Sequence, residues 1–337
     1  MTARQPQLLL QAAPFLRKGI TTPRLMTEVI IGMGPVVIAA VYYFGLSAIL
    51  VILAATAGAV GTEWAFGRPR GKSLGDGSAI LTGVVLGLCL PPGIALWIAF
   101  MGGVAGIGLG KLVFGGLGQN LFNPALVGRA FLQAAFPTAL TTWAVRSDLG
   151  GVLSARQSNF ALPFMQSAPD AMTAATPLGK MKFEQESTAI WDLMIGNTGG
   201  SLGETCGLVI ILCGVYLGLR GMFDWRIPVS ILLTVFILSG AIWLFNPEAY
   251  PAPWFMVGSG GLLFGCVYMA TDPVTSPITP RGAWIFGIGV GVLVVLIRIW
   301  GGLPEGVMYA ILLMNAATPL IERIAQPRPF GRRRGAA

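Results

Sequence analysis

The sequence predicts an all-α, multi-pass membrane protein with about ten transmembrane helices in two inverted five-helix repeats that contain broken helices. Composition is the first indication: of 337 residues, 54% are hydrophobic and only 11% are charged, whereas soluble domains carry about 25% charged residues. Long uncharged stretches are the second indication, and proline-broken segments in both halves are the third. A mean hydropathy of +0.73 agrees with a chain that meets lipid.

The first half of the chain holds five expected spans. Residues 29–62 contain no charged residue, and as a single helix they would measure about 51 Å at about 1.5 Å per residue. Because the hydrocarbon core is about 30 Å thick, they predict two spans joined by a turn near Gly45. Residues 77–110 predict two more, separated at Pro91-Pro92-Gly93, and the fifth covers about 123–136.

The second half predicts five further spans and completes the division of the chain. These spans are expected near 204–220, 227–245, 254–270, 283–300 and 306–322. The resulting segments are a cytoplasmic N-terminal segment (1–26), the first repeat (27–136), an extracytoplasmic loop (137–203), the second repeat (204–322) and a basic cytoplasmic tail (323–337).

The distribution of basic residues predicts the orientation in a bacterial plasma (inner) membrane. Pro14, Arg17 and Lys18 interrupt the segment before the first span, which lacks the early apolar core of a signal peptide, so the N-terminus is expected in the cytoplasm. An even number of spans then places the C-terminus there too, with most of the 22 Lys and Arg residues, Lys111 among them. This asymmetry agrees with the positive-inside rule and accounts for the net charge of +8 without nucleic acid.

The residue inventory excludes several classes of enzyme. The chain has no histidine, which excludes a Ser-His-Asp triad and histidine-ligated haem or zinc. Its four cysteines lie in apolar stretches without Cys-x-x-Cys spacing, so we interpret them as small buried hydrophobic residues rather than iron–sulfur ligands. No metal site is expected. Neither a Walker sequence nor a dinucleotide-binding fingerprint is present, so nucleotide binding is not expected either.

A short ordered match between the halves indicates the internal repeat. Residues 111–117 resemble residues 298–303, and each follows a proline-broken segment, at Pro91-Pro92 in one half and at Asp272-Pro273 in the other. Because each half has an odd number of spans, the two repeats must have opposite orientations, as in many transporters. Chance similarity of glycine-rich turns is the alternative and stays open at this point.

Two polar, proline-punctuated segments are candidates for a cofactor or ion site. Residues 115–125 and 271–277 are too irregular for plain turns, and irregular backbone at membrane depth needs protein, ligand or water as a partner. Arg129 lies within the fifth predicted span and needs an anionic or carbonyl partner there. The candidate side chains are Asn120, Asn123, Arg129, Asp272 and Thr275. Two surface turns, with Arg129 paired structurally inside the protein, are the alternative.

The predicted extracytoplasmic loop contains Asp170-Ala171-Met172-Thr173-Ala174-Ala175-Thr176-Pro177-Leu178. Pro177 disfavours a helical backbone at Thr176, and an extended threonine among small residues leaves its hydroxyl open to another enzyme. A second run, residues 199–205, opens the sixth span, where free N–H groups could accept an anion or a cofactor edge and Glu204 could attract cations. From the residues alone, an ordinary loop and a glycine-rich cap are the simpler interpretations.

These segments resemble those of a known family. Asp-x-x-Thr-Ala-Ala-Thr at 170–176 is similar to the flavinylation motif Asp-x-x-(Ser/Thr)-Gly-Ala-Thr, and residues 118–126 and 196–205 match the flanking motifs in order. By this resemblance the chain is identified as a member of the family that unites the D-type subunit of Rnf complexes with the B-type subunit of sodium-translocating NADH:quinone oxidoreductase. Ala174 departs from the motif, which usually has glycine there.

The resemblance implies a redox function. It implies that a flavin transferase attaches FMN through its phosphate to Thr176, a threonine linkage of phosphoprotein type. It also implies a second, non-covalent flavin, riboflavin, which we expect near 120–123 and 271–275. The chain would be an electron-transfer subunit, not catalytic alone, of an ion-translocating ferredoxin:NAD+ oxidoreductase that moves Na+ or H+. The expected partners are Rnf subunits A, B, C, E and G and membrane lipid. The recognition elements of the flavinylation motif would be Asp170, Thr173 and Ala175.

Three other functions stay open from the sequence. The first is a B-type subunit of the sodium-translocating quinone reductase, although the short segment before the first span favours the Rnf complex. The second is a transporter or channel without redox function, because inverted repeats with broken helices are common there and the family is thought to share a fold with urea channels. The third is a purely structural assembly subunit. Covalent flavin separates the redox subunit from the transporter.

Overall fold

The computed structural model describes residues 21–67, 73–143, 155–163, 176–196 and 198–326. These residues form helices, turns and loops and no strand, which confirms the predicted all-α class. Gly45, with a φ of 69°, joins the first two helices where the sequence predicts a turn. Within the described residues, five helices are long and apolar enough to cross a membrane: α1 (Thr22–Phe44), α2 (Leu46–Gly67), α10 (Arg226–Phe245), α13 (Pro280–Trp300) and α14 (Val307–Ala325).

Other apolar segments are shorter than the predicted spans because proline and glycine interrupt them. One helix stops just before Pro91-Pro92-Gly93, and another is broken at Ser259-Gly260-Gly261. Two of the segments end in a π-helical turn. The bounds are α3 (Ser78–Leu88), α4 (Leu96–Ile107) with η3 (Gly108–Leu112), α5 (Pro124–Ala135), α9 (Gly207–Leu219), α11 (Pro253–Gly258) and α12 (Leu262–Phe264) with η7 (Gly265–Met269).

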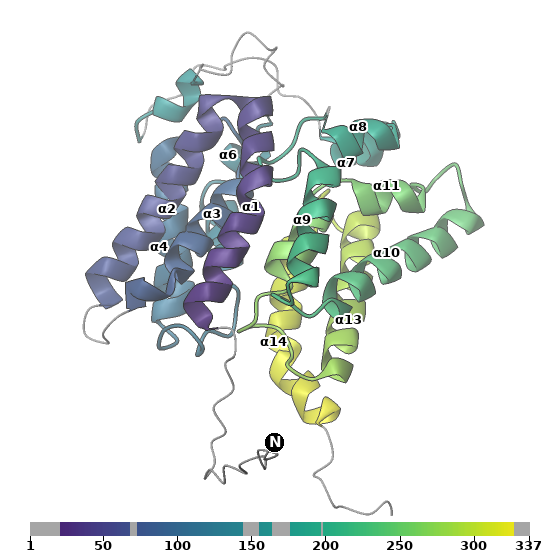
Figure 1. Cartoon of the computed structure of the whole chain (residues 1–337). Helices are drawn as coiled ribbons and strands as arrows, with labels where there is room; N and C mark the ends of the chain where they lie inside the picture. Colours follow the sequence, from purple (N-terminus) through teal and green to yellow (C-terminus); the bar gives the residue numbers. More distant parts are fainter. Residues whose placement is uncertain (1–20, 68–72, 144–154, 164–175, 197, 327–337) are drawn as a thin grey trace, which may run out of the picture.

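The two halves of the chain form two helix bundles that lie side by side (Figure 1). In the first bundle α2 packs against α3 and α4, and in the second α10 packs against α11 and α13. The bundles meet where α1 lies along α9 and where α5 contacts α14. α1 begins and α14 ends at the same lower end of the molecule (Figure 1).

Close approach of the helix backbones depends on glycine. A Cβ atom added to Gly103 of α4 would lie 2.2 Å from the carbonyl oxygen of Ala55 in α2. In the second bundle, a Cβ added to Gly287 of α13 would lie 1.7 Å from Ser230 Oγ in α10. Small residues that admit close backbone contact are the usual packing device of membrane helices.

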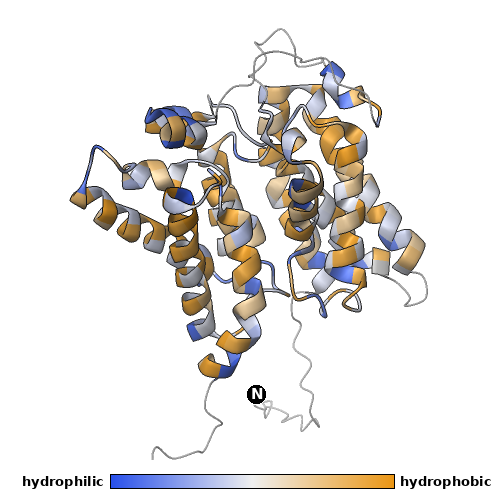
Figure 2. Ribbon diagram, turned by 180° about the vertical axis from the view of Figure 1, so that it is seen from behind, coloured by the Kyte–Doolittle hydropathy of each residue, from blue (hydrophilic) through white to orange (hydrophobic). Residues whose placement is uncertain are grey.

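The helices are largely apolar (Figure 2), and many of their exposed residues are large and hydrophobic. Phe245 at the end of α10 is 90% exposed and Leu219 at the end of α9 is 86% exposed. Exposed apolar area on this scale is unfavourable in water but is expected where a helix meets lipid or a partner subunit. Together with the five long apolar helices, it supports a membrane protein.

Three short α-helices belong to the predicted loop 137–203, which connects the two bundles in the sequence. They lie toward the upper end of the molecule (Figure 1). This is the end opposite to the start of α1. α8 packs against α9 and α11 of the second bundle, whereas α6 packs against α5 of the first, and Asn159 donates to the carbonyls of Pro92 and Ile94, so the loop contacts both bundles. The bounds of the three helices are α6 (Pro137–Thr141), α7 (Pro177–Gly179) and α8 (Ile190–Ile195).

Candidate functional site

Thr176 lies at the start of α7 with an extended backbone. Its φ of −66° and ψ of 156° confirm the conformation that Pro177 predicts. The hydroxyl Oγ1 accepts a hydrogen bond from the backbone N–H of Gly179 at 3.1 Å, and the residue is half-buried. The hydroxyl therefore has a fixed position. The predicted recognition residues Asp170, Thr173 and Ala175 lie outside the described residues.

A cavity opens beside Thr176, which we call the Thr176 cavity. It brings the threonine together with Thr198 and the glycine-rich run 199–205, and with two glycines of the broken α11–α12 segment. Two of its lining side chains are acidic, Glu204 and Glu305. The cavity is lined by Trp143, Thr176, Pro177, Leu178, Leu193, Thr198, Gly199, Gly200, Glu204, Thr205, Gly258, Gly260, Pro304 and Glu305.

Lys182 forms hydrogen bonds that connect its loop, which also contains Thr176, with the C-terminal end of α13. Its Nζ donates to the carbonyl oxygens of Arg298 and Leu303, both at 3.1 Å, and also to that of Gly301. The last carbonyl groups of a helix lack partners within the helix and carry its negative dipole end, so an ammonium group stabilises them. Burial lowers the pKa of Lys182, and the three carbonyl acceptors oppose that effect by holding the protonated amine.

A second, smaller cavity lies next to the first; we call it the inner cavity. Glu204 and Glu305 line both. In the inner cavity they meet Arg129 of α5 and Cys89, which follows α3. Arg129, for which the sequence predicts an anionic or carbonyl partner, thus lines one cavity together with two carboxylates. The inner cavity is lined by Cys89, Arg129, Ser201, Glu204, Gly261, Phe264, Met269, Glu305, Val307 and Met308.

Arg298 adds a second buried cation to this region. Only 4% of it is exposed, and its Nη1 donates to the carbonyl of Met256 at 2.6 Å. Its Nη2 donates to the carbonyl of Ser259 at 3.0 Å and to Glu305 Oε1 at 3.4 Å. Arg298 thus holds the interrupted backbone after α11, whose carbonyl groups have lost their helical partners.

A third cavity lies between the two bundles, and we call it the interface cavity. Its lining residues come from α1, α3, α5 and α9 and from the irregular segment that follows η7. Three of the predicted side chains line it: Asn120, Asn123 and Asp272. The other lining residues are Leu25, Met26, Val29, Ser78, Leu81, Thr82, Val85, Lys111, Leu117, Pro124, Ala125, Leu217, Met222, Phe223, Val267, Tyr268, Thr271 and Pro273.

Two of the predicted residues do not line this cavity. Thr275 lies behind Asp272 and donates from Oγ1 to Asp272 Oδ2 at 3.0 Å, so it positions the carboxylate. Arg129 belongs to the inner cavity instead. The sequence grouped it with the second flavin site because Arg129 follows Asn123 closely, but a helix starting at Pro124 carries the two side chains to different cavities.

The family comparison agrees with this arrangement of motifs. The model of the NQR2, RnfD, RnfE family matches residues 9–331. The chain belongs to the NQR2, RnfD, RnfE family. The resemblance inferred from the motifs is therefore confirmed.

Relatives in three bacteria are similar over nearly the whole chain. The chain is 41% identical to the D subunit of the ion-translocating oxidoreductase complex of Stutzerimonas stutzeri, over 92% of each chain. It is 39% identical to the D subunit of the proton-translocating ferredoxin:NAD(+) oxidoreductase complex of Clostridium ljungdahlii, over 96% of each chain. The D subunit of the Na(+)-translocating ferredoxin:NAD(+) oxidoreductase complex of Acetobacterium woodii is 36% identical, over 96% of this chain and 95% of that protein.

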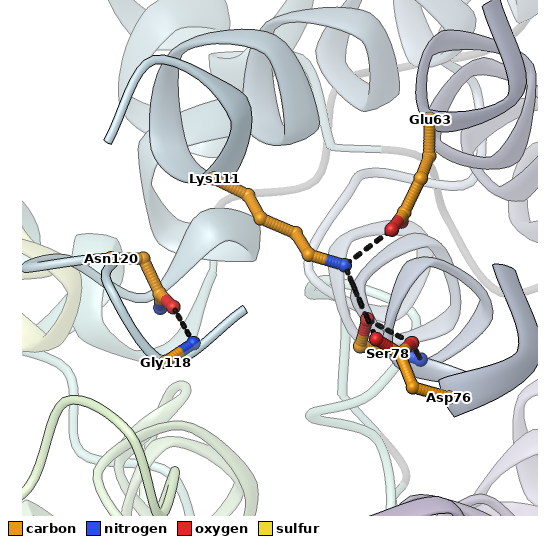
Figure 3. Close-up of polar contacts among 6 residues, drawn as sticks. All are labelled: Glu63, Asp76, Ser78, Lys111, Gly118 and Asn120. Carbon is orange, nitrogen blue, oxygen red and sulfur yellow. Dashed lines mark hydrogen bonds and ion pairs between the residues drawn. The ribbon is translucent and has the colours of Figure 1, made fainter. Parts of the chain in front are cut away.

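Lys111 of this NQR2, RnfD, RnfE family member lies where the sequence did not place it. We expected it in a cytoplasmic loop, but it is 1% exposed, in the wall of the interface cavity. Its Nζ contacts Glu63 Oε1 at 2.6 Å, Ser78 Oγ at 2.5 Å and Asp76 Oδ2 at 3.9 Å (Figure 3). The sequence feature that could have indicated this pair is Glu63, a single acidic residue close to a long apolar run. A carboxylate buried there needs a cation as its partner.

Sequence reasoning also missed three residues around Thr176. Lys182 follows Thr176 closely, whereas Arg298 and Glu305 come from a segment remote in sequence, and the structure places the three beside the same cavity or the same helix end. Arg298 carried a signal, since it lies within an apolar run where a charge needs a partner. Glu305 carried none, since its sequence context is that of an ordinary turn.

Proposed function

We propose that this chain is the D subunit of an ion-translocating ferredoxin:NAD+ oxidoreductase (Rnf) complex, and that it transfers electrons through FMN bound covalently to Thr176. Membership of the family and relatives named as D subunits of such complexes support the first part. The arrangement at Thr176 supports the second. The chain would not be catalytic alone.

The single observation that carries the flavin proposal is the position of Thr176. Its hydroxyl lies on an extended, half-buried backbone at the rim of a cavity. A modifying enzyme can bind an extended segment of this kind more readily than a helical one, because the backbone groups of a helix are already hydrogen-bonded to one another. The neighbouring Gly199 and Gly200 leave room for a bulky group beside the hydroxyl. FMN supplies the redox chemistry, and the protein supplies its position and electrostatic surroundings.

The interface cavity is where we place the proposed second, non-covalent flavin, riboflavin. The cavity lies between the two bundles, and ligand pockets occur preferentially between packed helices. Its wall is mostly apolar and offers a few polar groups, among them Asn120, Asn123 and Asp272. That combination suits a ring system with polar edges.

The proposed topology is ten spans in two inverted repeats, in a bacterial plasma membrane. The repeat is supported by the equivalent packing of α4 on α2 and of α13 on α10. It is also supported by the helix ends at Lys111 and Arg298, the two buried cations in the segments that match in sequence. With both termini in the cytoplasm, Thr176 lies on the extracytoplasmic side, because the short helices α6 to α8 lie at the opposite end from the start of α1 (Figure 1).

The proposed partners follow from the complex: Rnf subunits A, B, C, E and G, membrane lipid, and a flavin transferase during maturation. The relatives' names favour the Rnf complex over the quinone reductase. A transporter without redox function would need no covalent flavin. A purely structural subunit would leave electron transfer intact in a Thr176→Ala variant.

The experiment that tests the flavin proposal is in-gel ultraviolet fluorescence of the denatured chain, expressed together with its flavin transferase. The expected result is a fluorescent band that Thr176→Ala abolishes and the matched control Thr198→Ala keeps, since Thr198 lines the same cavity. A native chain without fluorescence would show that Ala174 prevents modification, and it would favour the transporter.

A further inference from the structure

Two half-buried carboxylates converge at the boundary between the Thr176 cavity and the inner cavity. Glu204 comes from the loop before α9 and Glu305 from the turn before α14, and both line both cavities. A Cβ atom added to Gly261 would lie 2.8 Å from Glu204 Oε1 and 3.4 Å from Glu305 Oε1. The two oxygens therefore approach the same small space, which exists because residue 261 has no side chain.

The two carboxylates differ in their partners. Glu305 Oε1 accepts hydrogen bonds from the backbone N–H of Gly261 at 2.9 Å and from Arg298 Nη2 at 3.4 Å. Glu204 Oε1 is fully buried and has no hydrogen-bond donor among the residues that the structure describes. A buried carboxylate oxygen without a donor is costly, so this atom needs a ligand, and a proton is the smallest one that fits beside a second carboxylate.

Charged groups around Glu204 and Glu305 balance the negative charge of the two carboxylates. Arg129 faces them from α5 and Arg298 from α13, and the thiol of Cys89 lines the same cavity. With both acids ionised, the two positive and two negative charges cancel. In surroundings of low dielectric constant, one additional negative charge nearby is therefore poorly compensated unless a cation enters with it.

We propose that Glu204, with Glu305 as its hydrogen-bonding partner, binds one proton when the flavin on Thr176 is reduced. This inference rests on the proposed function. A flavin bound at Thr176 would supply the redox chemistry, with a reduced redox centre of a neighbouring subunit as its electron donor, and the Glu204 carboxylate takes up one proton from water to balance the added charge. The new O–H bond lies at Oε1 and donates to Glu305. The net charge of the region is then unchanged, and the proton leaves when the flavin is reoxidised.

The experiment is redox-difference infrared spectroscopy of the purified, flavinylated complex. Reduction is expected to produce an absorption band of a protonated carboxyl group, which Glu204→Gln abolishes. Glu305→Gln should keep the band but displace it, because an amide replaces the carboxylate as acceptor. Glu184→Gln, a change at an exposed glutamate of the same loop region, should leave the spectrum unchanged.

The outcomes separate the inference from the proposed function. A band that persists unchanged in Glu204→Gln, or one lost only in Glu305→Gln, overturns the assignment while Thr176 keeps its fluorescent flavin. A native chain without fluorescent flavin overturns both. If Glu204→Gln fails to assemble, Glu204→Asp retains a carboxyl group, and a displaced band in that variant supports the assignment whereas an unchanged band contradicts it.

Discussion

Asn123 joins the two halves of the molecule by donating from Nδ2 to the backbone carbonyl of Met269 at 3.2 Å, across 146 positions of sequence. The same side chain caps α5, because its Oδ1 accepts from the backbone N–H of Ala125 at 3.0 Å. Met269 ends the π-helical turn η7, and its carbonyl also accepts from the backbone N–H of Asp272 at 3.5 Å. One amide thus fixes the start of α5, the end of η7 and one wall of the interface cavity.

Asn123→Ala is therefore expected to release the non-covalent flavin. The variant loses a helix cap and a buried hydrogen bond, which together cost about 1–3 kcal/mol of stability. Flavin extracted per chain and thermal unfolding in detergent measure the two effects. Asn246→Ala is the control, since that side chain caps an exposed turn, where it accepts from Ala249 N at 3.3 Å.

Asp272→Asn offers a milder version of the same test. Asparagine keeps the shape and the acceptor for Thr275 but removes the negative charge from the cavity wall. We expect it to fold normally and to retain less non-covalent flavin. Full flavin retention in both Asn123→Ala and Asp272→Asn would show that the second flavin binds elsewhere.

Lys182→Met is expected to loosen the loop that carries Thr176. Three carbonyl groups near the end of α13 lose a charged donor, and hydrogen bonds to charged groups contribute about 1.5–3 kcal/mol. Limited proteolysis between 176 and 196 should therefore become about tenfold faster, since a tenfold change corresponds to about 1.4 kcal/mol. Lys180→Met is the matched control, and equal cleavage rates in the two variants would contradict the role of Lys182.

The sequence predicted local features well because local rules determine them. The turn at Gly45 and the extended backbone at Thr176 each follow from one residue and its neighbours. The meeting of Asn120 and Asn123 with Asp272 in one cavity agrees with the site predicted from their two polar segments, whereas the position of Thr176 beside the glycine-rich run was not predicted.

The pairing of charges could not be predicted in the same way. The contact between Lys111 and Glu63 joins residues 48 positions apart, and the contact of Lys182 with the Arg298 carbonyl joins residues 116 apart. A basic residue beside an apolar run has the same sequence context whether it ends in a cytoplasmic loop or in a buried ion pair. For Lys111, the packing of α4 on α2 determines which of these two environments the residue has.

A double-mutant cycle on Lys111 and Glu63 tests whether this pair is a unit. Removing one partner leaves an uncompensated buried charge, so Lys111→Met and Glu63→Gln should each cost about 3–5 kcal/mol. The double variant should be more stable than the sum of the two changes implies. Thermal unfolding measures the cycle. The half-buried pair of Arg226 with Asp224, at 3.2 Å, is the comparison and should contribute about 1 kcal/mol or less because it remains in contact with solvent. Additive effects at Lys111 and Glu63 would contradict their coupling.

Gly103→Ala is expected to disturb the packing of α4 on α2 without touching any cavity residue. The new Cβ would lie 2.2 Å from the carbonyl oxygen of Ala55 and 2.7 Å from the backbone nitrogen of Ala59. Because backbone atoms cannot rotate away, the helices must separate, which costs about 1–3 kcal/mol. Gly61→Ala on α2 is the matched control, since its Cβ would meet nothing within 4 Å and alanine favours a helix by about 0.5–1 kcal/mol. Thermal unfolding should therefore move in opposite directions for the two variants, and equal stability of both would show that α2 and α4 are not held by backbone contact.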